Sequence, residues 1–165
     1  MRKQKGFSLI ELLIVVAIIL IIAAIAIPNL LRSRMAANES SAVGSIRTIN
    51  TSEVTYSSTY PQVGFSAALV DLSDGGTSPC TATSTQACLI DQTLANAQNA
   101  ATPKSGYFFT YAPGGATTPE VVYTIIGEPS TPNQTGQRQF FSDQSGVIRF
   151  TTDGTAPTAA STPLQ

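Results

Sequence analysis

The sequence predicts an α+β protein in which one long N-terminal helix packs on a four-stranded antiparallel sheet. Three observations carry this prediction. Residues 7–31 are almost wholly apolar, residues 32–58 place apolar side chains at helical spacing, and residues 104–151 hold four segments rich in aromatic and β-branched residues. We therefore expect a helix over 7–58 and a globular head over 59–165.

The first part of the helix is predicted to span a membrane. Leu12 to Ile27 is an unbroken apolar run of sixteen residues, and with its flanks (7–31) it reaches the roughly 20 residues that a bilayer-spanning helix needs. Arg2, Lys3 and Lys5 precede it. Basic residues favour the cytoplasmic side, so we expect this end of the helix to face the cytoplasm.

The second part of the helix is predicted to be amphipathic and to cover the sheet. Its stripe at about 3.6-residue spacing consists of Met35, Ala42, Ile46, Ile49, Glu53 and Tyr56. A helix from Phe7 to Ser58 would be about 78 Å long, more than one bilayer can cover. Pro61 is the expected stop. Glu53 on this stripe is interpreted as a snorkelling or locally hydrogen-bonded acid rather than a functional one.

The head is predicted to have three parts. Residues 59–103 are rich in Ser, Thr, Gly and Pro, with helical patterns at Phe65–Leu72 and Gln86–Ala97. Residues 152–165 are rich in Thr, Ala and Pro, so we expect a loose tail. The middle part, 104–151, holds the predicted strands 107–111, 121–126, 138–141 and 147–150.

Composition excludes several classes of function. The chain has no histidine, which removes Ser-His-Asp and Cys-His catalysis and His-ligated zinc. A formal net charge of −1 gives no basic field for nucleic acid. We therefore predict no enzymatic activity, no cofactor, no metal and no nucleic-acid partner. The aromatic residues are expected to pack in the core rather than to stack on bases.

Four aspartates adjoin predicted turns, namely Asp71, Asp74, Asp143 and Asp153. A calcium site is the alternative to turn chemistry, but it would need several oxygen ligands that converge, and no EF-hand spacing is present.

The most specific motif is Lys5-Gly6-Phe7-Ser8-Leu9-Ile10-Glu11, followed by the apolar run and by Pro28. It resembles the class III signal of type IV pilins and type II secretion pseudopilins, and the resemblance covers about residues 1–60. It implies the ladle fold of pilins. It also implies that prepilin peptidase removes the leader 1–6 by cutting between Gly6 and Phe7, and then methylates the new amine of Phe7. Gly6 lacks a side chain, which lets a peptidase approach that bond closely.

Glu11 is the one charge within the apolar segment. A charged side chain in a membrane helix costs about 2.5–3.5 kcal/mol on insertion scales. Cleavage would create a positive amine at Phe7, and in a staggered bundle that amine of one subunit can meet Glu11 of a neighbour. In the pilin family this acid acts in filament assembly, and the resemblance implies the same role for Glu11.

Pro28 is predicted to kink or locally unwind the helix, because it cannot donate a backbone hydrogen bond and frees the Ala24 carbonyl. The family shares this proline. The sequence departs from many relatives at Leu20, where they carry glycine, so melting of the helix near that point is less expected here.

The two cysteines, Cys80 and Cys88, are predicted to form a disulfide, which would place the head in an oxidising compartment. Two free thiols are the alternative. In many pilins a disulfide instead closes a C-terminal loop, so this position is a departure from the family.

Two other interpretations of the N-terminus remain. A secretory signal peptide could be cut after the small residues Ala24-Ile25-Ala26, but the apolar run is long for such a signal and Glu11 interrupts its start. A simple membrane anchor would leave Gly6 and Glu11 unexplained.

The sequence thus predicts a structural subunit of a type IV pilus, with a type II secretion pseudopilin as the alternative and a tethered periplasmic enzyme or binding module as the third hypothesis. The expected partners are further copies in a helical filament, prepilin peptidase, the inner-membrane assembly platform and inner-membrane lipid. We expect an inner-membrane precursor that crosses once with its N-terminus in the cytoplasm. It would then become part of an extracellular pilus, or of a periplasmic fibre if it is a pseudopilin.

Overall fold

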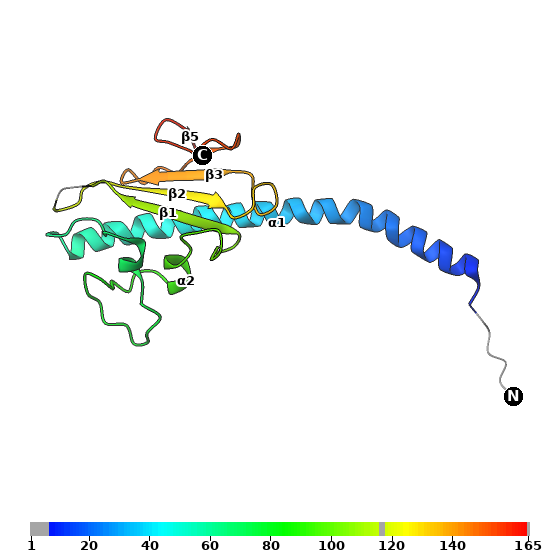
Figure 1. The fold of residues 1–165 in the computed structure, drawn as a ribbon, viewed down its shortest axis with the longest axis horizontal. Coiled ribbons are helices and arrows are strands. Elements are labelled where there is room, and N and C mark those ends of the chain that lie inside the picture. The colour runs from blue at the N-terminus through cyan, green and yellow to red at the C-terminus, as the bar shows by residue number, and fades with distance from the viewer. Residues whose placement is uncertain (1–6, 116–117, 165) are drawn as a thin grey trace. The chain divides into compact units, whose positions relative to one another are not determined.

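The computed structural model describes residues 7–115 and 118–164. The chain divides into two compact units between Arg34 and Met35, and helix α1 (Leu9–Thr59) contributes to both. Figure 1 shows α1 and the strands that follow it. The two units are described separately below.

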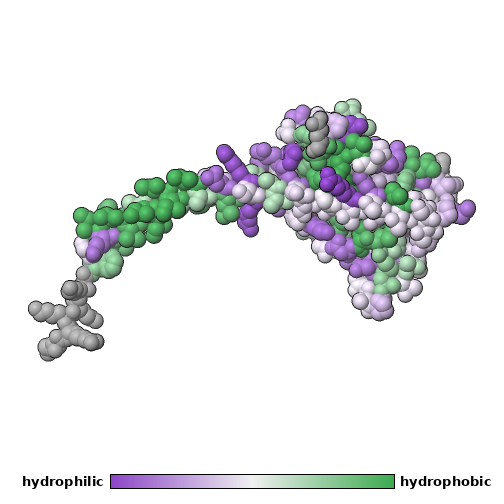
Figure 2. All heavy atoms as spheres, turned by 180° about the vertical axis from the view of Figure 1, so that it is seen from behind, coloured by the Kyte–Doolittle hydropathy of each residue, from purple (hydrophilic) through white to green (hydrophobic). Residues whose placement is uncertain are grey.

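The N-terminal unit consists of the first half of α1. Its large apolar side chains are all exposed, from 45% at Val16 to 80% at Leu9. Figure 2 shows this part of the helix as an almost continuous apolar surface. Among the described residues, α1 is the one helix that is long and apolar enough to cross a membrane. Since water is a poor solvent for so much apolar surface, this unit is suited to lipid or to other apolar helices.

The second unit contains an antiparallel sheet with the strand order β1-β2-β3-β4-β5. Its strands are β1 (Tyr107–Pro113), β2 (Tyr123–Pro129), β3 (Gln139–Asp143), β4 (Arg149–Thr151) and β5 (Thr162–Pro163). The fold class is therefore confirmed: a long apolar helix precedes a sheet on which its second half packs.

The number of strands corrects the prediction of four. The C-terminal tail contributes β5, which pairs Thr162 with Phe150 and Pro163 with Arg149. The Leu164 amide donates to the Ile148 carbonyl at 2.8 Å, and the Arg149 guanidinium donates to the Ser161 carbonyl at 3.0 Å. These bonds hold a segment whose Thr-, Ala- and Pro-rich composition predicted a loose tail.

The helical patterns predicted in residues 59–103 were too long. Only η1 (Leu69–Leu72, a 3-10 helix) and α2 (Gln92–Ala95) form. The reason is a competing backbone pairing between residues 71–74 and 87–90. In it Ala87 donates to the Asp71 carbonyl and Asp74 donates to the Ile90 carbonyl. The Ile90 amide donates to the Leu72 carbonyl at 3.0 Å, so it cannot also donate to the Gln86 carbonyl as a helix from Gln86 to Ala97 would require.

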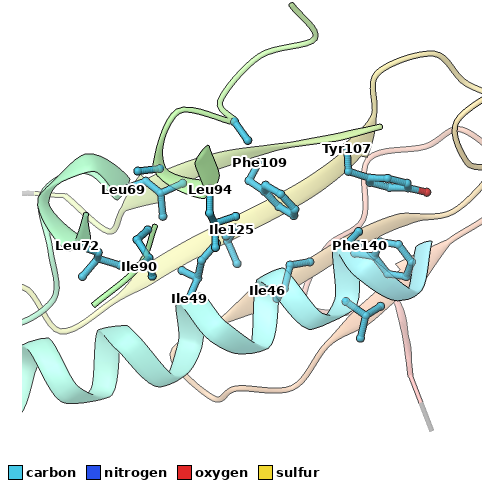
Figure 3. Close-up of a cluster of buried hydrophobic side chains, with 14 of the residues drawn as sticks. Ile46, Ile49, Leu69, Leu72, Ile90, Leu94, Tyr107, Phe109, Ile125 and Phe140 are labelled. Atoms are coloured by element: carbon cyan, nitrogen blue, oxygen red, sulfur yellow. The ribbon is translucent and has the colours of Figure 1, made fainter. Parts of the chain in front are cut away.

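The core lies where the second half of α1 meets the sheet and the segments before it. The predicted stripe is buried from Ala42 to Tyr56, while Met35 is half-buried. Figure 3 shows the cluster, which joins Ile46 and Ile49 of α1, Leu69 and Leu72 of η1, Ile90, Leu94 of α2, and Tyr107, Phe109, Ile125 and Phe140 of the sheet. On β2, Gly127 permits the close approach of the helix, because a Cβ there would lie 3.2 Å from the Ile46 Cδ1.

Two buried acids fix the position of the head on the helix. Glu39 accepts hydrogen bonds from the Gln137 amide (2.9 Å), the Arg138 amide (3.1 Å) and the Arg138 Nε (2.7 Å). The Glu53 carboxylate is fully buried and accepts from the Ser66 amide (3.0 Å) and the Ser66 hydroxyl (2.5 Å). Each acid therefore satisfies backbone donors of a segment distant in sequence.

Candidate assembly site at the N-terminus of the long helix

The candidate site begins at the first turn of α1. The first amides of a helix have no partner inside the helix, so a side chain or the solvent must satisfy them. Here the Ser8 amide donates to Glu11 Oε2 at 3.0 Å, and the Leu12 amide donates to the Ser8 carbonyl at 3.3 Å. Glu11 therefore caps the start of its own helix.

This capping contact was missed by the reasoning from sequence, although a signal for it is present. The residues Ser8-Leu9-Ile10-Glu11 match the capping-box pattern, in which the acid at the third helical position reaches back to the amide of the N-cap residue. Of the two hydrogen bonds of a capping box, the structure contains the one from the Ser8 amide to the Glu11 carboxylate.

Glu11 lies among exposed apolar side chains. Ile10 is 64% exposed, Leu12 is 58% exposed, and Phe7 is 80% exposed. A carboxylate in such surroundings has no cationic partner within the described residues of its own chain. Chemically, the segment offers one anion and a row of apolar side chains to whatever covers it.

The predicted processing site lies at the edge of the described residues. Gly6 falls outside them, and Phe7 is the first residue that the structure describes. Cleavage between Gly6 and Phe7, and methylation of Phe7, remain predictions.

Pro28 lies inside α1, and the helix continues through it from Leu9 to Thr59. The structure therefore contains no local unwinding at this position. A kink at Pro28 remains a prediction, with its physical basis in the missing amide donor and the ring of the proline.

The disulfide between Cys80 and Cys88 is confirmed, with 6.1 Å between the two Cα atoms, a separation within the usual range. The loop that it closes is anchored to the helix, because the Tyr56 hydroxyl donates to the Ser84 carbonyl at 2.6 Å. The disulfide therefore stabilises the head and takes no part in the N-terminal site.

The four turn aspartates do not converge. No group of three or more potential metal ligands occurs within residues 7–115 and 118–164. Asp143 and Asp153 instead accept bonds from the nearby amides of Ser145 (2.9 Å) and Thr155 (3.1 Å), which is the expected turn chemistry.

Comparison with known proteins places the similarity at the N-terminus. Residues 1–27 match the family model for the prokaryotic N-terminal methylation motif. The chain is 67% identical over 39 residues to the type IV wide pilus major component PilA4 of Thermus thermophilus. It is 43% identical over 54 residues to the type IV major pilin protein PilA of Myxococcus xanthus.

These matches are partial. The first covers 24% of this chain and 30% of the relative, and the second covers 33% of this chain and 24% of the relative. No solved structure matches the chain. For most of the head, therefore, these comparisons give no relative with which to compare its structure.

Proposed function

We propose that this chain, whose N-terminal segment is that of the type IV pilin family, is a structural subunit that polymerises into a type IV pilus through α1. The observation that carries the proposal is the first half of α1, an exposed apolar helix with one acid in its first turn. The methylation motif over residues 1–27 and the similarity to two type IV pilins support it.

In this proposal the chain is first an inner-membrane precursor with a cytoplasmic N-terminus. Prepilin peptidase removes residues 1–6 and methylates the amine of Phe7, and the apolar helix keeps the product in the membrane. The assembly platform then transfers subunits from lipid to the filament. The pilus serves adhesion, surface motility or DNA uptake.

The ion pair between subunits gives the assembly its register. The Phe7 amine of one subunit meets Glu11 of its neighbour. At about 4 Å and an effective dielectric constant of 20, the attraction is about 4 kcal/mol before desolvation costs. A subunit in the wrong register would leave both charges without a partner in an apolar environment.

Packing between helices supplies the cohesion. The exposed apolar side chains of α1 exchange lipid contacts for contacts with neighbouring helices, and dispersion adds up over many turns. Small side chains let helix backbones approach closely. In this segment they are Ala17, Ala23, Ala24 and Ala26.

The substitution Glu11→Ala tests the proposal. We expect the variant to insert in the membrane at the wild-type level, while the yield of sheared surface filaments falls more than tenfold, because the amine of each neighbour loses its partner. Glu128→Ala in β2 is the matched control, because within residues 7–115 and 118–164 the side chain of this head acid makes no hydrogen bond or ion pair. A wild-type filament yield from Glu11→Ala would refute the ion pair.

The type of filament is tested separately. Deletion of the protein from its host should remove surface fibres if it builds a pilus. Loss of exoprotein secretion with surface fibres intact would instead indicate a type II secretion pseudopilin. Mass spectrometry of the sheared fibres should show a chain that begins with N-methylated Phe7. Any other N-terminal residue would contradict the processing step.

A further inference from the structure

We propose that Ser8 is a positioning residue for assembly: its backbone amide holds the Glu11 carboxylate through Oε2 in the unassembled subunit, so that Oε1 is presented to the incoming amine. This inference rests on the proposed function, because it concerns how the assembly acid is prepared for its partner. It assigns Glu11 two simultaneous contacts, one within the subunit and one between subunits.

The geometry of the first turn carries the proposal. Oε2 accepts from the Ser8 amide at 3.0 Å, and Oε1 accepts no hydrogen bond from the described residues. An ionised carboxylate has about four acceptor sites on its two oxygens, so the cap leaves capacity for a second donor. The cap also removes rotamer freedom from Glu11 before the neighbour arrives, which lowers the entropy lost on binding.

The apolar surroundings of Glu11 increase the importance of its hydrogen bond with the Ser8 amide. In the hydrocarbon region no water can satisfy a free amide or a bare carboxylate, so both groups must find partners within protein. The Ser8 amide and Glu11 satisfy each other in the same turn. In the unassembled subunit the Ser8 amide therefore has a partner in lipid, while Glu11 Oε1 stays available to a second donor.

Amide exchange tests the cap directly. The full-length chain in phospholipid bicelles is labelled with ¹⁵N, and hydrogen exchange is followed at Ser8. In Glu11→Ala we expect exchange at Ser8 to be about fivefold faster, which corresponds to the roughly 1 kcal/mol of a typical N-terminal cap. Glu11→Gln keeps an oxygen acceptor and should exchange at the wild-type rate. An equal rate in the wild type and Glu11→Ala would overturn the proposal.

Filament yield tests the positioning role. Ser8→Pro removes the amide donor and keeps the charge of Glu11, whereas Ser8→Ala keeps the donor and serves as the matched control. Counted per processed subunit, filaments should fall about fivefold in Ser8→Pro and stay at the wild-type level in Ser8→Ala. Equal yields from these two variants would overturn the positioning role.

The two proposals fail in different ways. Glu11→Gln retains the cap and loses the charge, so it should form no filaments while Ser8 remains protected. Normal filaments from Glu11→Gln would refute the ion pair of the proposed function and leave the cap standing. Fast exchange in the wild type itself, with no filaments from Glu11→Gln, would refute the cap and leave the ion pair standing.

Discussion

Glu39 and Glu53 lie on the same helix, and both carboxylates contact the head, yet their environments differ. For Glu39, burial raises the pKa, but the bonds from Gln137 and Arg138 outweigh burial and the net pKa is lowered. For Glu53, burial raises the pKa and outweighs the hydrogen bonds from Ser66, so the net pKa is raised. The donors from Gln137 and Arg138 thus favour the charged form of Glu39, whereas burial favours the protonated form of Glu53.

The two acids predict opposite dependences of stability on pH. Because folding raises the pKa of Glu53, its protonated form contributes stability that is full below about 4.5 and is lost as pH rises through the raised value. The free energy of unfolding of the wild type relative to Glu53→Gln should therefore increase as pH falls from 7 to about 4.5. Each unit of pKa difference corresponds to about 1.4 kcal/mol.

Glu39→Gln is the matched control for this measurement. Because folding lowers the pKa of Glu39, its contribution is present above about 4.5 and is lost as pH falls through the lowered value. Denaturant unfolding of the full chain in detergent, followed by near-UV circular dichroism from pH 3 to 7, measures both variants. Parallel pH curves for Glu39→Gln and Glu53→Gln would contradict the assignment.

At the residue scale, the sequence placed Glu53 on the apolar stripe of the helix and predicted a snorkelling or locally hydrogen-bonded acid. The full burial of the Glu53 side chain contradicts snorkelling, and its hydrogen bonds agree with the other possibility. The sequence did not predict the partner Ser66, which comes from a loop whose path no periodicity encodes. The Glu39–Arg138 pair was likewise hidden, since its members are 99 residues apart in sequence. Contacts of this kind depend on the fold and not on local pattern.

Helix α1 combines two surfaces in its second half, and the contrast can be measured. Ile46 is fully buried against the sheet, whereas Val54 is 59% exposed on the same helix. Ile46→Ala should lower the free energy of unfolding by about 2–5 kcal/mol, because it removes buried methyl groups and leaves a cavity.

Val54→Ala should change the stability by no more than about 0.5 kcal/mol, since exposed sites rarely matter more. Both variants are compared by denaturant unfolding of the full chain in detergent. A loss for Val54→Ala as large as that for Ile46→Ala would show that the outer face of this half-helix is covered.

The helices and strands could largely be predicted where apolar residues recur at helical spacing or where aromatic and β-branched residues cluster. The helix was expected over 7–58 and lies at Leu9–Thr59, and the first strand was expected at 107–111 and lies at Tyr107–Pro113. The predicted strand 121–126 shifts to Tyr123–Pro129, because Val121 and Val122 are exposed and precede the pairing. β-Branched composition marks a strand but does not set its ends.

At the scale of the whole molecule, one covalent link joins two points of the head. The loop closed by Cys80 and Cys88 is short, and the chain-entropy model gives about 2–3 kcal/mol for it. We expect the double substitution Cys80→Ser and Cys88→Ser to lower the free energy of unfolding by about this amount in a non-reducing buffer.

Reduction of the wild type is the matched control for this prediction. In the presence of a thiol reductant the wild type should unfold with the stability of the double variant, because both lack the link. A wild type that stays 2–3 kcal/mol more stable under full reduction would show that the serines, and not the lost link, cause the effect.

The fold class of the whole molecule could be predicted from the sequence, but the number of strands could not. The helix and meander followed from the pattern, whereas β5 is only two residues long and its Thr-Pro sequence carries no strand signal. The first-turn contact of Glu11 had a recognisable motif, and Gly6 lies outside the described residues. The capping motif therefore marks the Glu11 contact in the sequence, whereas the composition of the tail does not indicate β5.

Because the protein has only two cysteines and both lie in the disulfide, it has no free thiol. A single cysteine introduced at the exposed Ala100 would be the one site open to a maleimide dye under non-reducing conditions. Fluorescent subunits made in this way would let the proposed incorporation into fibres be followed by microscopy on living cells.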